Sequence, residues 1–173
     1  TGRIPHFLAK KELFDLPVIG RSLYWMKQIP VDRAGRSIDS LKMAEEVLAE
    51  NGVIIIYPEG TTTKDPDMWP MVGRLGMIRL ALSTGAPVIP VGQWGVHETL
   101  PKGAKVPKVF PRRTSAIRVG PESDLAWLRD LDQPTTKDLA AATDQVMGEI
   151  TDLMAPLRGE TPPEKRFNPA QQR

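Results

Sequence analysis

The segment from residue 29 to residue 91 alternates short β-branched runs with stretches of helical periodicity, and this order restricts the fold more than any other feature. Strand composition occurs three times, at Ile29–Asp32, Val53–Tyr57 and Pro87–Val91. Helical spacing fits Ser37–Ala49, where Ser37 is a good N-cap, and Val72–Ser83. Right-handed crossovers between parallel strands are the usual solution to this order. We therefore predict an α/β fold with a mostly parallel central sheet flanked by helices.

Weaker patterns continue the chain on both sides of this core. Further strands are predicted at His6–Ala9 and Ser115–Val119, and Thr136–Met154 has the spacing of an amphipathic helix. Its expected apolar face is Leu139, Ala142, Val146, Ile150 and Leu153. From Pro156 onward, prolines stand among polar residues. We expect one domain over residues 1–155 and a flexible C-terminal tail over residues 156–173.

The composition fits a globular domain and excludes several site classes. The chain has 173 residues, of which 40% are hydrophobic and 25% charged. Its longest apolar run, Val53–Tyr57, is far shorter than the roughly 20 residues of a membrane-spanning helix. The absence of cysteine excludes disulfides, thiolate zinc sites and a cysteine nucleophile from this sequence.

Positive charge is concentrated in one segment although the net charge is only +2. No acidic residue occurs between Thr99 and Pro121, whereas six basic residues do: Lys102, Lys105, Lys108, Arg112, Arg113 and Arg118. Such a patch attracts phosphates or an anionic membrane surface. The alternative is a solvated loop with ordinary surface cations. The small net charge gives no reason to expect a nucleic-acid partner.

Ligands of open parallel sheets bind beyond the carboxyl ends of the strands. This rule selects three loops, which we expect to converge on one edge: Asp32–Arg33, Pro58–Thr61 and Gly92–Trp94. The guanidinium of Arg33 has the planar geometry that suits a phosphate. Helices beginning near residues 37 and 72 would direct their positive N-termini to the same edge.

Several of these residues also have structural interpretations. Arg33 could pair with Asp32 or Glu59 instead of a ligand. Arg74, expected in the first turn of its helix, is either a second anion ligand or a solvated surface residue. Glu59 follows an apolar strand, where a carboxylate is costly unless it is paired or used. The indoles of Trp69 and Trp94 are expected to pack and not to serve as substrate platforms.

The segment Leu13–Val31 is rich in large apolar residues and poor in charge. The first interpretation is a helix and turn that face the core. The second is an interfacial surface, with Tyr24 and Trp25 at the depth of lipid headgroups and Arg21 and Lys27 near their phosphates.

Several blocks together resemble a known family. Tyr57–Thr61 resembles the Phe-Pro-Glu-Gly-Thr block of the 1-acylglycerol-3-phosphate acyltransferases, the glycerolipid and lysophospholipid acyltransferase family. Ile29–Arg33 and Gly85–Val91 are similar to the blocks on either side of it, and Lys10–Leu13, Pro17 and Gly20 match the usual approach to the first of these. Order and spacing agree from Phe7 to Gly92, about half of the chain.

The resemblance implies transfer of a fatty acyl group from a thioester to the free hydroxyl of lysophosphatidic acid or a related lysophospholipid, in phosphatidic acid and phospholipid biosynthesis. It implies a glycerol-3-phosphate acyltransferase-like fold and substrate binding by Arg33, Glu59, Gly60, Thr61, Thr62 and Arg74. The donor is acyl-CoA or acyl-carrier protein, and no bound cofactor or metal is expected. It further implies a membrane-associated enzyme on the cytoplasmic face.

Two departures from the family pattern affect the site. Thr62 stands where the family often has Arg or Lys, so Arg74 is expected to replace a phosphate ligand. The family's general base lies in a His-x-x-x-x-Asp motif, but His6 and His97 are followed at that distance by lysines. We expect no catalytic residue in this sequence, and we expect the motif upstream of Thr1. The acyltransferase domain would then lack its N-terminal part here and be inactive alone.

Two alternatives remain open at this stage. One is a non-catalytic phospholipid- or phosphate-binding module that uses the same cationic residues and lacks the base. The other is an acyltransferase with a glycolipid acceptor, because Thr62 weakens the case for a phosphate.

Overall fold

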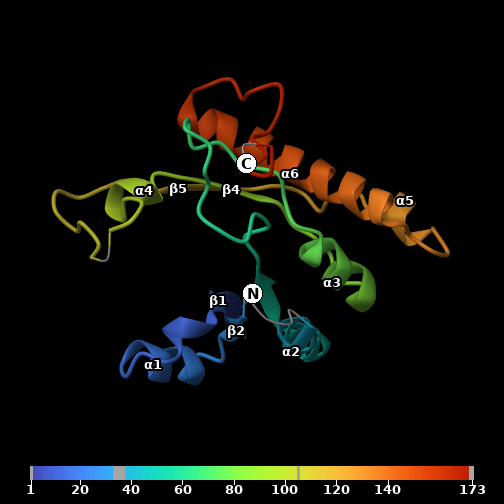
Figure 1. Cartoon of the computed structure of the whole chain (residues 1–173), viewed down its shortest axis with the longest axis horizontal. Coiled ribbons are helices and arrows are strands. Elements are labelled where there is room, and N and C mark those ends of the chain that lie inside the picture. Colours follow the sequence, from blue (N-terminus) through green and yellow to red (C-terminus); the bar gives the residue numbers. More distant parts are fainter. Residues whose placement is uncertain (1, 33–37, 105, 172–173) are drawn as a thin grey trace. The chain divides into compact units, whose positions relative to one another are not determined.

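The computed structural model describes residues 2–32, 38–104 and 106–171, and they form two compact units (Figure 1). The N-unit consists of Thr1–Tyr57 and Gly76–Ala86, and the C-unit of Pro58–Leu75 and Pro87–Arg173. None of the helices in the described residues is both long enough and apolar enough to span a bilayer.

The N-unit contains a parallel three-stranded sheet. Its order is β2 (Ile29–Val31), β1 (Pro5–Lys10) and β3 (Val53–Ile55), so the first strand of the chain is central. Leu8 pairs with Ile29 on one side, and Phe7 pairs with Ile55 on the other. The three predicted strands are confirmed, and so is a parallel sheet. The strand near His6, predicted without a partner, lies between the other two.

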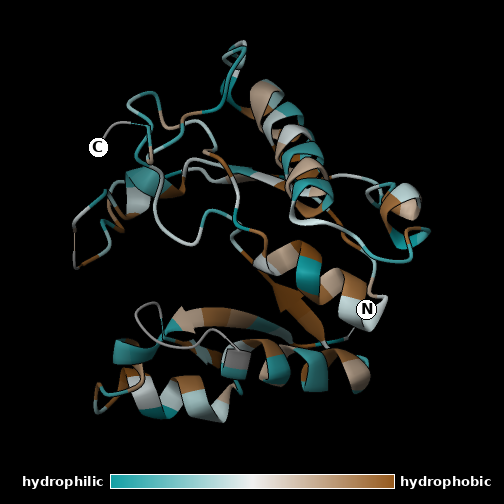
Figure 2. Ribbon diagram, turned by 45° about the vertical axis from the view of Figure 1, so that its right-hand side comes forward, coloured by the Kyte–Doolittle hydropathy of each residue, from teal (hydrophilic) through white to brown (hydrophobic). Residues whose placement is uncertain are grey.

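The described part of the N-unit also contains four helices. They are the 3-10 helix η1 (Lys11–Leu13) and the α-helices α1 (Ile19–Trp25), α2 (Ile38–Ala49) and α3 (Gly76–Thr84). Two of them, α2 and α3, contribute to the core of the sheet. The side chains of Ile29, Ala44 and Leu80 are almost fully buried together, one each from β2, α2 and α3. Figure 2 shows mainly hydrophobic colour on the strands and mixed colour along α2, as expected for an amphipathic helix against a sheet.

The segment Leu13–Val31 contains both buried and exposed apolar side chains. Phe14 and Ile29 are buried, at 6% and 1% exposure. The backbone of Phe14 approaches Gly20 so closely that a Cβ there would lie 2.0 Å from the Phe14 carbonyl oxygen, which explains the glycine. Val18 and Trp25, however, are 81% and 85% exposed. The segment is therefore only partly core-facing, and its contact with lipid stays a prediction.

The C-unit is an antiparallel hairpin packed on a long helix. Strands β4 (Val91–Trp94) and β5 (Ala116–Val119) pair with Gly92 opposite Arg118. The short helices α4 (Val96–Thr99) and α5 (Ala126–Arg129) and the helix α6 (Thr136–Arg158) complete the unit. A capping box begins α6, in which the Thr135 and Asp138 side chains each bond the other's backbone N–H.

The predicted third parallel strand, Pro87–Val91, is wrong. The strand begins only at Val91, and its partner β5 is antiparallel. Pro87 and Pro90 have no N–H to donate. The Val88 and Pro90 carbonyls still accept bonds from Ser123 N–H (2.8 Å) and Gly120 N–H (2.9 Å). Strand β4 is therefore not a parallel partner of β2 or β3 in the described residues. That the loops after the three strands converge on one edge stays a prediction.

Two helix boundaries differ from the sequence pattern. The helix predicted from Val72 begins at Gly76, because Val72 N–H donates to Phe167 O (3.1 Å) and Arg74 N–H to Pro58 O (2.8 Å). Arg74 therefore precedes the helix, and the expectation that it lies in the first turn is wrong. Helix α6 continues past Met154 to Arg158. The division of the chain after residue 155 stays a prediction, as does the helix cap at Ser37, which lies outside the described residues.

Candidate functional site

The loop of residues 58–75, here called the site loop, carries most of the predicted substrate-binding residues. It contains no helix or strand, but its own side chains hold it in place. The Thr63 hydroxyl donates to the Trp69 carbonyl oxygen at 2.8 Å. Oδ1 of Asp65 accepts from the N–H groups of Asp67 (2.9 Å) and Trp69 (3.2 Å). These are the bonds by which Asp and Thr side chains fix turns.

Glu59, at the start of the site loop, is a half-buried carboxylate with one backbone donor. Its Oε2 accepts from Met71 N–H at 3.0 Å, which ties the two sides of the loop together. Burial raises the pKa of Glu59 above its ordinary value, the Met71 hydrogen bond opposes this, and the charge of Asp65 adds to the rise. Glu59 thus links the two sides of the loop by a hydrogen bond, although its carboxylate loses part of its hydration on burial.

Gly60 and Arg74 lie in contact within the same loop. Gly60 has a φ of +68°, and a Cβ built on it would lie 2.9 Å from Arg74 Nε. Glycine is therefore required both by the left-handed backbone and by the approach of the guanidinium. The Arg74 backbone is fixed by its bond to the Pro58 carbonyl oxygen (2.8 Å), and its side chain is exposed. This places an accessible cation over the Glu-Gly-Thr turn.

The structure thus brings together Glu59, Gly60 and Arg74, three of the six predicted substrate-binding residues. Thr61 follows them half-buried, and Thr62 is exposed. Arg33 lies outside the described residues. The substrate-binding role of all six stays a prediction.

Sequence reasoning missed Arg158, which fastens the site loop to helix α6. Its side chain is only 4% exposed, and its guanidinium carbon lies 4.0 Å from the Trp69 ring centroid and 4.2 Å from that of Trp94. Its Nη1 donates to the Asp67 carbonyl oxygen at 2.8 Å, and its Nη2 pairs with Glu160. A planar cation between two indoles is a strong packing arrangement.

The sequence indicated only one part of this arrangement, the packing of the two indoles. Trp69 was expected to pack, and it is 5% exposed. Arg158 lies in the last turn of α6, directly before the C-cap Gly159, whereas the pattern predicted an end at Met154. Nothing local connects residue 158 with residue 69, so the pairing could be found only in three dimensions.

The two histidines do not form a catalytic dyad in the described residues. His6 Nδ1 lies 2.7 Å from the Lys27 carbonyl oxygen. The His97 ring lies 4.4 Å, centroid to centroid, from that of Trp94. Within the described part of the chain, neither ring forms an ion pair with a carboxylate, and no group of three His, Cys, Asp or Glu residues could hold a metal ion.

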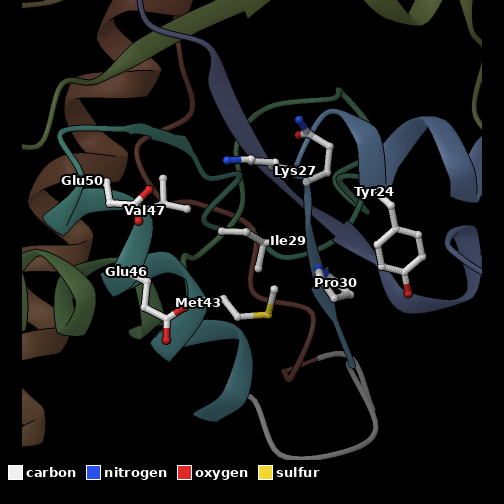
Figure 3. A pocket seen from close by; sticks show the side chains of 9 residues that line it. Tyr24, Lys27, Ile29, Pro30, Met43, Glu46, Val47 and Glu50 are labelled. Carbon is white, nitrogen blue, oxygen red and sulfur yellow. The ribbon is translucent and has the colours of Figure 1, made fainter.

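A separate pocket lies in the N-unit. It has a volume of about 290 Å³, and α1, β2 and α2 contribute to its lining (Figure 3). Figure 3 shows the Ile29 side chain between those of Met43 and Val47, with Tyr24 on the other side of Pro30. None of the predicted substrate-binding residues in the described ranges lines this pocket.

Comparison with known sequences identifies the family. Residues 1–94, more than half of the chain, match the sequence profile described as Acyltransferase. This chain belongs to the acyltransferase family. A 1-acyl-sn-glycerol-3-phosphate acyltransferase of Bacillus subtilis is 30% identical to it over 151 residues, which are 86% of this chain and 68% of the relative. The resemblance inferred from the sequence blocks is confirmed.

Other relatives of this acyltransferase chain are longer. A chloroplastic 1-acyl-sn-glycerol-3-phosphate acyltransferase of Brassica napus is 30% identical over 106 residues, which are 60% of this chain and 30% of that protein. The chain therefore spans less than a third of its plant relative. The crystal structure of the 1-acyl-sn-glycerophosphate (LPA) acyltransferase PlsC of Thermotoga maritima has a TM-score of 0.61 at 22% identity, covering 92% of this chain and 59% of that one. This likeness and the parallel sheet confirm the predicted fold class.

Proposed function

We propose that the protein transfers a fatty acyl group from an acyl thioester to the free hydroxyl of lysophosphatidic acid or a related lysophospholipid. Family membership and the names of the relatives support this reaction class. The observation that carries the acceptor assignment is the exposed guanidinium of Arg74 on Gly60, inside the motif that resembles the acceptor block. A guanidinium binds a phosphate through charge-assisted and often bidentate hydrogen bonds.

The chemistry balances without an oxidant or a metal. A base removes the proton of the acceptor hydroxyl, and the oxygen attacks the thioester carbonyl. The carbon–sulfur bond then breaks, and the thiolate receives a proton. The family resemblance assigns the base to a His-x-x-x-x-Asp motif, which these 173 residues do not contain. The printed chain supplies the phosphate side of the acceptor site.

The residues of the site loop divide that task. Arg74 binds the phosphate, and the Thr61 and Thr62 hydroxyls add neutral donors beside it. The family resemblance assigns Arg33, which lies outside the described residues, as a further phosphate ligand. Glu59 holds Met71 and so fixes the turn that presents Gly60 and Arg74. Binding the acceptor in a pre-formed turn lowers the entropic cost of bringing its hydroxyl to the thioester.

The proposal extends to donor and location. The acyl donor is acyl-CoA or acyl-carrier protein, and the enzyme works at the cytoplasmic face of a membrane, where lysophospholipids reside. No nucleic acid takes part. The printed names of the relatives are those of lipid-biosynthetic enzymes, which supports a lipid surface as the place of action.

An acceptor panel tests this proposal. The full-length protein is given acyl-CoA or acyl-carrier protein with lysophosphatidic acid, with the matching monoacylglycerol that lacks the phosphate, and with a glycolipid acceptor. We expect transfer to lysophosphatidic acid and a KM higher by roughly tenfold or more without the phosphate. Equal use of acceptors with and without the phosphate, or preference for the glycolipid, would contradict it. Tight binding without any transfer would indicate the binding module.

A further inference from the structure

Residues 100–115, here called the docking segment, connect α4 to β5 and contain no helix or strand in their described part. Figure 1 shows this stretch extending beyond the end of the β4–β5 hairpin within the C-unit. It is tied back near its base, where Lys108 N–H donates to the Thr99 carbonyl oxygen at 2.6 Å. The hairpin below it is held by the four-residue pairing of β4 with β5. The docking segment therefore projects from a hairpin that is itself held in place by strand pairing.

The docking segment exposes large apolar side chains. Phe110 is 82% exposed, Val106 74%, Val109 63% and Leu100 46%. They occur within eleven residues, and three of them lie within five positions of one another. Single exposed apolar residues are ordinary, but a group of this kind indicates a surface that contacts something apolar.

Cations lie between these apolar residues and directly after them. Lys108 and Arg112 are exposed, and no described acidic side chain forms an ion pair with either. Arg113 is paired with Glu98 at 3.6 Å, and Lys102 Nζ donates to the Thr63 carbonyl oxygen at 3.1 Å. A partner for the segment must therefore be apolar at one depth and anionic at another. The headgroup region of a bilayer with anionic phospholipids has both properties, whereas a nucleic acid offers no apolar layer for Val106, Val109 and Phe110.

We propose that the docking segment binds the surface of a bilayer that contains anionic phospholipid. Val106, Val109 and Phe110 enter the interface, and Lys108 and Arg112 lie at the level of the lipid phosphates. This rests on the proposed function, because lysophosphatidic acid and phosphatidic acid are themselves anionic membrane lipids. The Lys102–Thr63 hydrogen bond joins the docking segment to the site loop, so docking brings the acceptor loop to the surface that holds its substrate.

The first test reads the segment directly. The printed sequence has no cysteine, so V109C introduces a labelling position there, with any cysteine elsewhere in the full-length protein replaced by serine. The thiol carries a polarity-sensitive dye, and the matched control is A140C on the exposed side of α6. With vesicles of phosphatidylcholine and about one third phosphatidic acid, we expect a blue shift and brighter emission at position 109 and none at position 140. No shift at 109, or equal shifts at both positions, would overturn the proposal.

The second test separates charge from apolar contact. The double variant K108S/R112S should weaken partition onto phosphatidic acid vesicles by roughly 25-fold, since each interfacial cation contributes about fivefold. F110S should weaken it by roughly tenfold or more, in high salt as well as low salt. Binding that is equally tight to neutral vesicles, or that both variants retain in full, would contradict the assignment.

Activity distinguishes this proposal from the proposed function. With a short-chain lysophosphatidic acid dispersed below its aggregation concentration, K108S/R112S and F110S should match the parent, whereas on vesicle substrate both should have a raised KM. Parent protein that inserts the segment but transfers no acyl group would sink the proposed function alone. Parent protein that transfers acyl groups while the dye at position 109 stays in water would sink the docking proposal alone.

Discussion

The site loop and the docking segment are both long irregular stretches of the C-unit, but they differ in what surrounds them. In the site loop, Trp69 and Met71 are 5% and 1% exposed, and a buried guanidinium fastens the loop to α6. In the docking segment, Phe110 is 82% exposed. A loop that buries its own side chains and satisfies their polar groups has one conformation before any ligand arrives. A loop that leaves large apolar side chains exposed offers them to a partner, which we propose above to be a bilayer surface.

Removing the fastening residue should give the largest effect. We expect Arg158→Ala to lower the free energy of unfolding by about 2–4 kcal/mol, because two indole contacts and a bond to the Asp67 carbonyl are lost. Chemical denaturation measures the loss, and acceptor KM should rise with it. Lys137→Ala, on the exposed start of α6, is the control and should change neither. An Arg158→Ala protein as stable as the parent would show that buried contacts of Arg158 do not hold the site loop in place.

Gly60→Ala should give the next largest effect, and the chain offers a matched control. Gly60 and Gly85 have nearly equal φ angles, +68° and +66°, but only Gly60 has a neighbour, Arg74 Nε, 2.9 Å from the added Cβ. Both substitutions should cost about 1 kcal/mol from the left-handed backbone, and only Gly60→Ala should also displace Arg74 and raise acceptor KM. Equal effects of the two substitutions on KM would show that the Gly60–Arg74 contact is not used.

The smallest effect should come from Glu59, and it depends on pH. Because burial raises the pKa of Glu59 in the folded protein above its unfolded value, the folded state holds this proton more tightly. This contribution to stability is full below the unfolded pKa, near 4.5, and is lost as pH rises through the folded pKa. Glu59→Gln removes the titration and keeps an oxygen for Met71 N–H.

Denaturation of parent and Glu59→Gln across this pH range tests the prediction. The stability of Glu59→Gln relative to the parent should rise between pH 4.5 and neutral pH, since only the parent must bury a charge there. Measuring the difference between the two proteins cancels the titration of every other group. A difference that stays constant with pH would mean that Glu59 is as well solvated as an ordinary surface carboxylate.

The sequence was informative where structure is decided locally. The strand containing Val53 and the helix that ends before Asn51-Gly52 follow from adjacent residues, and so does the start of α6 at Thr136. The start of α3 was misplaced because the N–H groups of Val72 and Arg74 donate to Phe167 and Pro58. Neither acceptor lies within a helical turn of its donor in the sequence. Non-local hydrogen bonds overrode a helical pattern there.

The candidate site divides in the same way. Its motif residues Glu59 and Gly60 were predictable, because the family resemblance is carried by residues that are adjacent in the sequence. Arg158 was not, because its value comes from Trp69 and Trp94, which the fold brings to it from two distant segments. The sequence pattern ended α6 before reaching it. Exposure of Val106 and Phe110 was equally hidden, since an apolar residue in a loop is as easily buried as exposed.

The central claim is that Arg74, held on Gly60, binds the acceptor phosphate. Its most direct test compares Arg74→Ala with Arg79→Ala in the full-length protein; Arg79 is an exposed arginine five positions later, on α3. We expect Arg74→Ala to raise the KM for lysophosphatidic acid by roughly tenfold or more and to leave the KM for the phosphate-free acceptor unchanged, while Arg79→Ala changes neither. An unchanged KM for lysophosphatidic acid in Arg74→Ala would contradict it.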